Sequence, residues 1–310
     1  MPAPKVSVIM AVHNEEDFLA EAVESALAQD YPSLEVVISD DGSTDRTREI
    51  ARGFAARQPE RVVLVHGDSN EGKAVAANRA LAAAKGELVA WLDGDDVMLP
   101  GKLSAQVAML ERRPDAVGCT HDAEVFDSDS GEVLGSFTQI YNGRPLREGG
   151  VDLWFDPTYR MLPSATMFRA AAAPAHGLDP RLTRVMDWLF DIEVFRNGTC
   201  VASQEMLVRY RRHSGQLTAP ENRERGLEGG LLVMDVVEAR YPELRRQARS
   251  SRAALLLGES RRLARLGDRR AALARASEGV RAGGPHGVAR IATHLVRAAR
   301  DRRRTRRDRA

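Results

Sequence analysis

The sequence is poor in cysteine and aromatic residues. Its 310 residues include two cysteines, Cys119 and Cys200, and 5% aromatic residues. Two cysteines cannot form a disulfide framework, and no His or Cys lies near them at zinc-ligand spacing. The sequence has no apolar run of about eighteen residues and no basic, apolar leader at its start. We therefore expect a protein of the reducing cytoplasm that neither spans a membrane nor is exported.

Charge is distributed unevenly along the chain, although the formal net charge is only +1. Residues 1–220 hold 22 Lys and Arg against 33 Asp and Glu, which gives −11. Residues 221–310 hold 23 against 11, which gives +12. Hydrophobic residues make up 43% of the chain, enough to bury a core and to exclude disorder as the main state. The division indicates two parts with different roles, and the basic part can meet an anionic surface.

Short β-branched runs alternate with segments of helical period in the first half of the chain. Strands are expected over residues 6–10, 35–39, 62–65 and 88–92. Helices are expected over residues 18–27, after Ser43, over residues 73–84, and from Pro100 to about Arg112. The alternation predicts an α/β fold, a Rossmann-like, mostly parallel sheet flanked by helices, with ligands outside the carboxyl ends of the strands.

Beyond residue 220, Arg, Ala and Leu recur with helical period. Residues 253–266 and 271–280 are expected to form helices, separated by Gly267 and Asp268. One hairpin is too little for a repeat array. We therefore expect an α/β domain over residues 1–220, a basic helical extension over residues 221–300, and a disordered basic tail over residues 301–310.

Polar clusters follow the ends of several expected strands. Residues 11–15 are Ala-Val-His-Asn-Glu, residues 40–43 are Asp-Asp-Gly-Ser, and residues 93–96 are Asp-Gly-Asp-Asp. Asp93 and Asp95 point the same way in an extended segment, and their mutual repulsion is relieved if they share a cation. Mg²⁺ and Mn²⁺ are commonly held by one or two carboxylates together with substrate phosphates. The alternative is a solvated acidic turn, but the position at a strand end favours a metal.

Other clusters allow two interpretations each. Asp40 and Asp41 suit a turn before a helix, or one carboxylate accepts the imide N–H of uracil. Asp187, beside Trp188, is either an exposed residue at a helix N-terminus or a base in a partly apolar pocket. His213, with Arg211, either closes over a diphosphate or lies on a basic loop.

In order and spacing these clusters resemble family 2 of the inverting glycosyltransferases, which have the GT-A fold. The resemblance covers about residues 4–215. The matching stretches are residues 6–15, 37–45, 70–72 with 77–78, 84–87 leading into 92–96, and 186–188. It implies a nucleotide diphosphate sugar as the donor, and UDP as its most common nucleotide. The C-terminal part from residue 221 lies outside the resemblance.

The resemblance also implies roles for individual residues. Asp187 matches the general base, and Asp95 and Asp93 match the metal-binding carboxylates for Mn²⁺ or Mg²⁺. The residues that match the nucleotide site are Ala11, His13, Asn14, Glu15, Asp40, Asp41, Gly72, Lys73, Asn78 and Asp93. The implied reaction is an in-line displacement in which Asp187 deprotonates an acceptor hydroxyl and the anomeric carbon inverts. By position, Trp188 and Ser164 are candidates for acceptor contacts, and His213 and Arg211 for diphosphate or metal contacts.

The sequence departs from the family in two places. Met186 stands where the family often has Glu before the base, and the Gln-x-x-Arg-Trp motif of processive synthases is absent. We therefore expect non-processive transfer of one or a few hexoses to a glycan, a lipid-linked sugar or a small molecule.

Two further functions compete with this one. A sugar-nucleotide pyrophosphorylase would carry a glycine-rich, basic loop after the first strand, where this chain has residues 11–15. A non-catalytic nucleotide-sugar-binding or scaffold protein could keep the same fold. The basic helices either contact the anionic inner face of a membrane, as a peripheral protein does, or form a solvated surface. No motif for binding nucleic acid is found.

Overall fold

The structure is a computed structural model that describes residues 3–156, 158–216 and 223–283. The chain divides into two compact units. The first comprises Met1–Trp154 and Thr158–Asn222, and the second comprises Arg223–Ala310 with Phe155–Pro157. We call them the α/β unit and the helical unit. The tail expected over residues 301–310 lies outside the described residues.

The first half of the α/β unit alternates strands and helices. Its elements are β1 (Val6–Val12), α1 (Leu19–Leu27), β2 (Leu34–Asp41), α2 (Thr47–Arg57), β3 (Val62–Gly67), α3 (Lys73–Ala83) and β4 (Leu88–Trp91). All four expected strands and the first three expected helices are present. The sequence pattern succeeds here because each strand is buried and each helix has one buried face.

The second half of the α/β unit is less regular. Its strands and α-helices are β5 (Val97–Met98), α4 (Lys102–Arg112), β6 (Ala116–Asp127), β7 (Val133–Ser136), β8 (Thr166–Arg169), α5 (Met186–Phe195) and β9 (Thr199–Arg212). Short helical turns connect them: η1 (Thr138–Asn142), η2 (Val151–Phe155), η3 (Pro163–Ala165) and η4 (Ala170–Ala172). Helix α4 begins two residues after Pro100, as expected.

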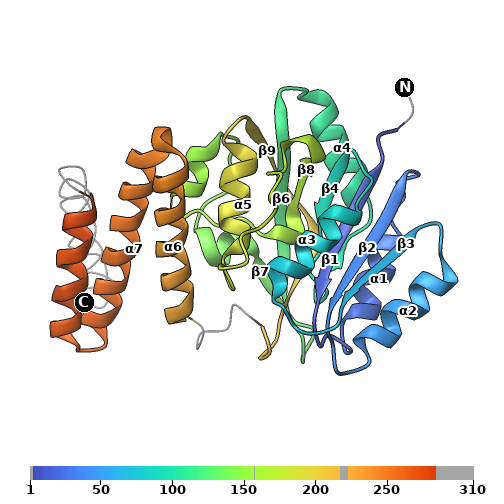
Figure 1. Ribbon diagram of the computed structural model, residues 1–310, viewed down its shortest axis with the longest axis horizontal. Coiled ribbons are helices and arrows are strands. Elements are labelled where there is room, and N and C mark those ends of the chain that lie inside the picture. Colours follow the sequence, from blue (N-terminus) through green and yellow to red (C-terminus); the bar gives the residue numbers. More distant parts are fainter. Residues whose placement is uncertain (1–2, 157, 217–222, 284–310) are drawn as a thin grey trace, which may run out of the picture. The chain divides into compact units, whose positions relative to one another are not determined.

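All these strands belong to one sheet with the order β3-β2-β1-β4-β8-β6-β9-β5, and β7 pairs with β6 (Figure 1). The strands from β3 to β4 are parallel. Beyond β4 the sheet is mixed, because β8 is antiparallel to both β4 and β6 while β9 is parallel to β6. The carboxyl ends of β1, β2 and β4 therefore meet at one edge of the sheet.

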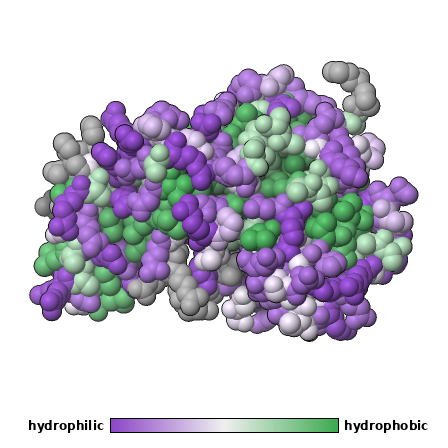
Figure 2. Space-filling view, in the orientation of Figure 1, coloured by the Kyte–Doolittle hydropathy of each residue, from purple (hydrophilic) through white to green (hydrophobic). Residues whose placement is uncertain are grey.

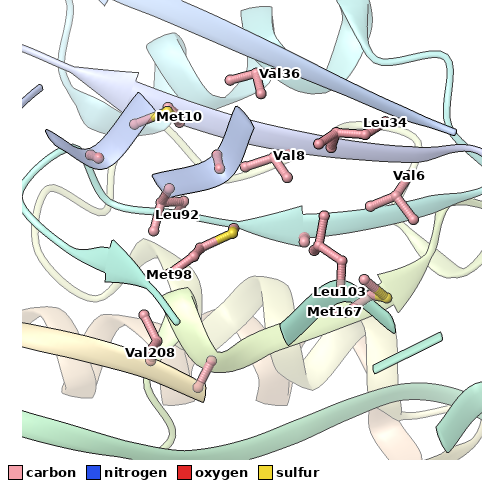
Figure 3. Close-up of a cluster of buried hydrophobic side chains, with 14 of the residues drawn as sticks. Val6, Val8, Met10, Leu34, Val36, Leu92, Met98, Leu103, Met167 and Val208 are labelled. Carbon is pink, nitrogen blue, oxygen red and sulfur yellow. The ribbon is translucent and has the colours of Figure 1, made fainter. Parts of the chain in front are cut away.

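Large apolar side chains are buried inside the α/β unit, while hydrophilic residues cover much of the face seen in Figure 2. Alternate residues of β1 point to one face of the sheet, where α1, α2 and α4 pack. Figure 3 shows Val6, Val8 and Met10 of β1 in this core with Leu103 of α4. The alanine-rich helix α3 packs against β1 and β2. The core therefore fixes the positions of β1 and β2, from which the loops of the site extend.

The helical unit contains α6 (Arg223–Arg240), η6 (Pro242–Leu244) and α7 (Arg245–Arg265), and residues 269–283 form a further helix. Helices α6 and α7 pack on each other through buried residues that include Val233, Val237 and Leu256. Gly267, with a φ of 90°, ends α7 where the sequence predicts the break. No helix among the described residues is both long enough and apolar enough to cross a bilayer.

Candidate active site

The loop after β1 is bound to the loop after β2. The backbone N–H of Asn14 donates to Ser43 Oγ at 3.0 Å, and Asn14 Oδ1 accepts from the Thr44 N–H at 2.9 Å. The Glu15 N–H donates to Thr47 Oγ1 at 2.7 Å. Asn14 has a φ of 53°, a conformation that Asn adopts more readily than most residues. Asn14 therefore fixes the two loops together at the sheet edge.

Asp41, the last residue of β2, lies at the centre of a second set of contacts. Its carboxylate accepts from the Gly72 N–H at 2.7 Å, from the Glu71 N–H at 3.2 Å and from Arg79 Nη2 at 2.5 Å. Its carbonyl oxygen lies 2.9 Å from His13 Nδ1. The buried Asp41 thus connects the loop after β1, the start of α3 and Arg79.

The carboxylates after β4 form a compact acidic cluster. One oxygen each of Asp93, Asp95 and Asp96 lie within 4.8 Å of one another. Lys73 Nζ lies 2.7 Å from Asp93 Oδ1, and His213 Nε2 lies 3.0 Å from Asp95 Oδ2. Burial alone would raise the pKa of Asp95, but the hydrogen bond with His213 and the charge of Lys73 lower it. These contacts therefore favour the ionised form of Asp95.

Two carboxylate oxygens, one in this cluster and one beside it, have no hydrogen-bond partner among the described residues. They are Asp96 Oδ2 and Glu15 Oε2, and both atoms are buried. Burial and then the charge of Asp95 raise the pKa of both groups. A Cβ added at Gly94 would lie 1.8 Å from Glu15 Oε2, so only glycine allows Glu15 to approach this closely. Buried, unpartnered carboxylate oxygens fit a site that takes up a divalent cation.

Arg211, near the end of β9, supports the acidic cluster from the protein side. Its N–H donates to Asp96 Oδ1 at 3.1 Å, its Nε donates to the Asp95 carbonyl at 2.7 Å, and Nη2 pairs with Glu21. The guanidinium lies over the rings of Phe18 and Phe126, 4.9 Å and 4.7 Å from their centroids. These contacts fix the loop after β4 to β9.

Asp187 lies in the first turn of α5 and is half-buried. The pKa of Asp187 is raised to about 6. Burial is the largest cause, the charge of Lys73 lowers the pKa, and the charge of Asp93 raises it. Asp187 is therefore within electrostatic range of Asp93 in the acidic cluster and of Lys73. A carboxyl group with this pKa is ionised in much of the population at neutral pH, yet basic enough to accept a proton.

One turn further along α5, the carboxyl of Asp191 is buried and its Oδ2 accepts from Trp154 Nε1 at 3.1 Å. Trp154 also holds Trp188, whose Nε1 donates to the Trp154 carbonyl at 2.6 Å. The Trp154 ring stacks on Phe195, with centroids 4.2 Å apart. Trp154 therefore contacts α5 at three positions, and these contacts fix the orientation of the turn that carries Asp187.

Several of the residues expected to contact ligands make hydrogen bonds within the protein. Asp40 is fully buried, accepts from the Ser43 N–H at 3.2 Å and pairs with Arg48 Nε at 2.6 Å. The Asn78 amide donates to the Leu178 carbonyl at 2.9 Å and accepts from the Leu178 N–H at 2.7 Å. Ser164 is fully buried, and its Oγ accepts from the Asp93 N–H at 3.0 Å. In this structure their polar groups position loops of the site. Ala11 is buried at the end of β1.

The sequence reasoning missed four residues of this site. Asp96 stands within the acidic cluster, but the i, i+2 argument selects Asp93 and Asp95. Arg79 follows Asn78 directly, and only the fold shows that it reaches Asp41. Asp191 is a carboxyl in an otherwise apolar turn of α5, a signal that could have been noticed. Trp154 has no local signal, because its partners Trp188 and Asp191 lie more than thirty residues away.

A family comparison identifies the protein class. The model of "Glycosyl transferase family 2" matches residues 7–175, more than half of the chain. The chain belongs to glycosyl transferase family 2. The matched residues contain Asp41, α3 and the acidic cluster, whereas Asp187, Arg211 and His213 lie beyond them. The fold is accordingly GT-A, with a C-terminal helical extension.

Named relatives support the same assignment. EpsE of Bacillus subtilis, a glycosyltransferase by its name, is 44% identical over 109 residues, which are 35% of this chain and 39% of that protein. The chain spans 39% to 46% of the length of the first three curated relatives it matches.

Solved structures show the same fold. TarS of S. aureus in complex with UDP-GlcNAc has a TM-score of 0.68 at 20% identity, and the match covers 92% of this chain and 83% of that one. The mannosyltransferase PcManGT of Pyrobaculum calidifontis, in complex with GDP-Man and Mn²⁺, has a TM-score of 0.62 at 20% identity, with 96% and 81% covered. The fold of the chain is therefore that of nucleotide-sugar glycosyltransferases.

Proposed function

We propose that the protein is a metal-dependent, inverting glycosyltransferase that moves a hexose from a nucleotide diphosphate sugar to an acceptor hydroxyl. The observation that carries this proposal is Asp187 in the first turn of α5, a carboxyl with a pKa of about 6 within electrostatic range of the acidic cluster. Sugar transfer to a hydroxyl needs a base close to the carboxylates that are proposed to bind the metal. The acceptor hydroxyl loses its proton to the base while the diphosphate leaves the donor sugar, so both groups must act on the same pair of substrates.

We propose UDP as the donor nucleotide, recognised around Asp41. A carboxylate offers about four acceptor positions, and Asp41 uses three of them for Gly72, Glu71 and Arg79. One position remains for an imide N–H such as that of uracil. TarS has been solved with UDP and with UDP-GlcNAc, which supports this choice, whereas PcManGT with GDP-Man supports the wider class. His13 lies in the loop after β1, and Gly72 and Lys73 lie at the start of α3. Asp40 holds the loop after β2 through Ser43, and Asn78 holds the segment before α5 through Leu178.

The residues after β4 fit a divalent cation, because three carboxylates converge there. One buried oxygen of Asp96 and one of the neighbouring Glu15 also have no hydrogen-bond partner among the described residues. Asp95 and Asp93 would hold Mn²⁺ or Mg²⁺, and the bound ion would stabilise the negative charge of the leaving diphosphate. Hard oxygen ligands suit either ion. His213 and Arg211 orient Asp95 through its carboxylate and its carbonyl.

The chain's own residues would carry the transfer as follows. Asp187 takes the proton of the acceptor hydroxyl, the hydroxyl oxygen attacks the anomeric carbon, and the bond to the diphosphate oxygen breaks. Attack from the face opposite the leaving group inverts that carbon. Lys73, whose ammonium is paired with Asp93, opposes the rise in the pKa of Asp187 and so favours its ionised, proton-accepting form.

The acceptor and the setting are also proposals. Trp188, half-buried next to Asp187, offers an aromatic face to an acceptor that is a glycan, a lipid-linked sugar or a small molecule. The absence of the Gln-x-x-Arg-Trp motif supports non-processive transfer. Cys119 and Cys200 are both free and buried, which suits a reducing cytoplasmic setting.

Calorimetric titration tests the proposal. We expect the wild type to bind UDP more tightly than GDP, dTDP or CDP, and to do so only with Mn²⁺. Asp95→Asn should weaken this binding at least tenfold, because a charged ligand of the cation is lost. Asp187→Asn is the matched control, since it should bind UDP as the wild type does but release UDP from UDP-sugars about 10²- to 10⁴-fold more slowly. No binding of any nucleotide by the wild type would contradict the proposal.

A further inference from the structure

The turn between α7 and the helix of residues 269–283 exposes two large apolar side chains. Leu266 is 69% exposed and Leu273 is 71% exposed. Arg269 and Arg270 share a helix face with Leu273, because residues three and four apart are neighbours on a helix. We call this surface the hairpin end, and it consists of Arg261, Arg265, Leu266, Arg269, Arg270 and Leu273. Figure 2 shows hydrophobic and hydrophilic residues side by side at the lower left, where Figure 1 places this turn.

Most arginines in the middle of these helices are neutralised by carboxylates. Arg249 pairs with Glu238 at 3.0 Å, Arg262 with Glu259 at 2.5 Å, and Arg275 with Glu278 at 2.8 Å. Arg252 pairs with Asp235. The arginines of the hairpin end differ from these.

No carboxylate among residues 3–156, 158–216 and 223–283 forms an ion pair with Arg261, Arg265, Arg269 or Arg270, and all four side chains are exposed. The acid in this turn is Asp268, whose Oδ1 accepts from the Ala271 N–H at 2.9 Å at the start of the next helix. Its charge is thus directed to a helix N-terminus, which carries a positive partial charge. Among the described residues, the hairpin end therefore presents four arginines without an ion-paired carboxylate, together with two exposed leucines.

This combination selects one kind of partner. Guanidinium groups pair well with phosphate, so the arginines alone would suit any polyphosphate surface. Contact with the charged backbone of a nucleic acid does not stabilise a leucine side chain, whereas burial in the apolar layer beneath lipid headgroups does. We propose that the hairpin end docks on the surface of an anionic phospholipid bilayer, with the arginines at the headgroup phosphates and Leu266 and Leu273 inserted between them. This goes beyond the transfer reaction and is independent of it.

Co-sedimentation of the full chain with vesicles tests this proposal without any activity assay. We expect binding to phosphatidylcholine vesicles that contain phosphatidylglycerol, and little binding to phosphatidylcholine alone. Arg269→Gln with Arg270→Gln should lower the partition coefficient roughly 30-fold, and Leu266→Ser with Leu273→Ser should lower it at least tenfold. All four positions are exposed, so the variants should melt as the wild type does in circular dichroism.

The matched control removes the same charge from the other end of α7. Arg245→Gln with Arg246→Gln changes two exposed arginines about 30 Å away along the helix, well beyond the screening length of physiological salt. This variant should bind nearly as the wild type does. Absence of binding to anionic vesicles at low salt would overturn the proposal, and so would equal losses in the control and the hairpin-end variants. Loss with the arginine variant but not with the leucine variant would contradict bilayer insertion and indicate a surface for another polyanion, such as single-stranded DNA.

Discussion

Asp187 and Asp191 lie one turn apart on α5, yet their surroundings give them different protonation states. Burial raises the pKa of Asp187 to about 6, and burial together with the charge of Asp187 raises that of Asp191 to about 8. At neutral pH Asp191 therefore keeps its proton while Asp187 is mostly ionised. Two negative charges on adjacent turns would repel each other, so the neutral Asp191 favours the ionised form of Asp187 that its proposed role as a base requires.

The raised pKa of Asp191 predicts a specific pH dependence of stability. In the unfolded chain an Asp has a pKa of about 3.9, so between that pH and the folded value of about 8 the unfolded state releases a proton that the folded state keeps. This contribution is fully favourable below about pH 4 and is lost as the pH rises towards 8. Asp191→Asn keeps an acceptor for Trp154 and cannot ionise. Its free energy of unfolding should exceed that of the wild type by a few kcal/mol at about pH 9 and match it at about pH 4.

Urea unfolding at several pH values measures this difference. Asp17→Asn, at an exposed position before α1, is the control and should leave the pH profile unchanged. A constant offset between Asp191→Asn and the wild type across the whole pH range would show that Asp191 is not protonated in the folded protein.

At the scale of elements, α3 connects three parts of the site. Lys73 at its start pairs with Asp93, Arg79 pairs with Asp41, and Asn78 holds Leu178, which precedes α5. The Asn78 amide donates one hydrogen bond to the backbone of Leu178 and accepts another from it, so two hydrogen bonds join α3 to the segment before α5. Helix α3 is therefore the element that relates the proposed nucleotide site to the proposed base.

Replacing Asn78 separates a positioning role from a binding role. Asn78→Ala removes both hydrogen bonds and leaves the backbone groups of the buried Leu178 without partners, which should cost about 2–4 kcal/mol of unfolding free energy. Turnover should fall about tenfold or more because the segment leading to Asp187 loosens. The dissociation constant of UDP should change little, because Asp41 keeps its contacts.

Asn197→Ala, at an exposed site after α5, is the matched control and should alter neither quantity. An Asn78→Ala variant with normal stability and much weaker UDP binding would instead assign Asn78 to the nucleotide, as the family resemblance implies.

How much of the site the sequence predicts depends on how far apart along the chain the contacting residues lie. The acidic cluster, Asp41 and Asp187 could be found because each lies in a short motif at an element end. The contacts of Arg79 with Asp41, of Asn78 with Leu178 and of Trp154 with Asp191 join residues 38, 100 and 37 positions apart. No local pattern encodes such pairs. The mixed part of the sheet was not predicted for the same reason, since β8 and β9 pair with β6 only after long irregular connections.

For the whole molecule, the separation of charge matters more than its sum. Residues 1–220 carry −11 and residues 221–310 carry +12, so copies of the chain can attract one another although the net charge is +1. A net charge close to zero also gives little mutual repulsion to oppose that attraction. The interaction is electrostatic and acts over a distance that salt controls, about 30 Å at 0.01 M and about 8 Å at physiological ionic strength.

This charge separation predicts reversible self-association at low salt. Light scattering at pH 7 should report an apparent mass that is highest in dilute buffer and falls as sodium chloride is added, because screening weakens attraction between the acidic and basic parts. An apparent mass that does not depend on salt would show that the two parts do not attract each other between molecules. A mass that rises with salt would indicate apolar association, and the variant with Leu266→Ser and Leu273→Ser distinguishes this outcome, because it removes the two most exposed leucines among the described residues while leaving every charge in place.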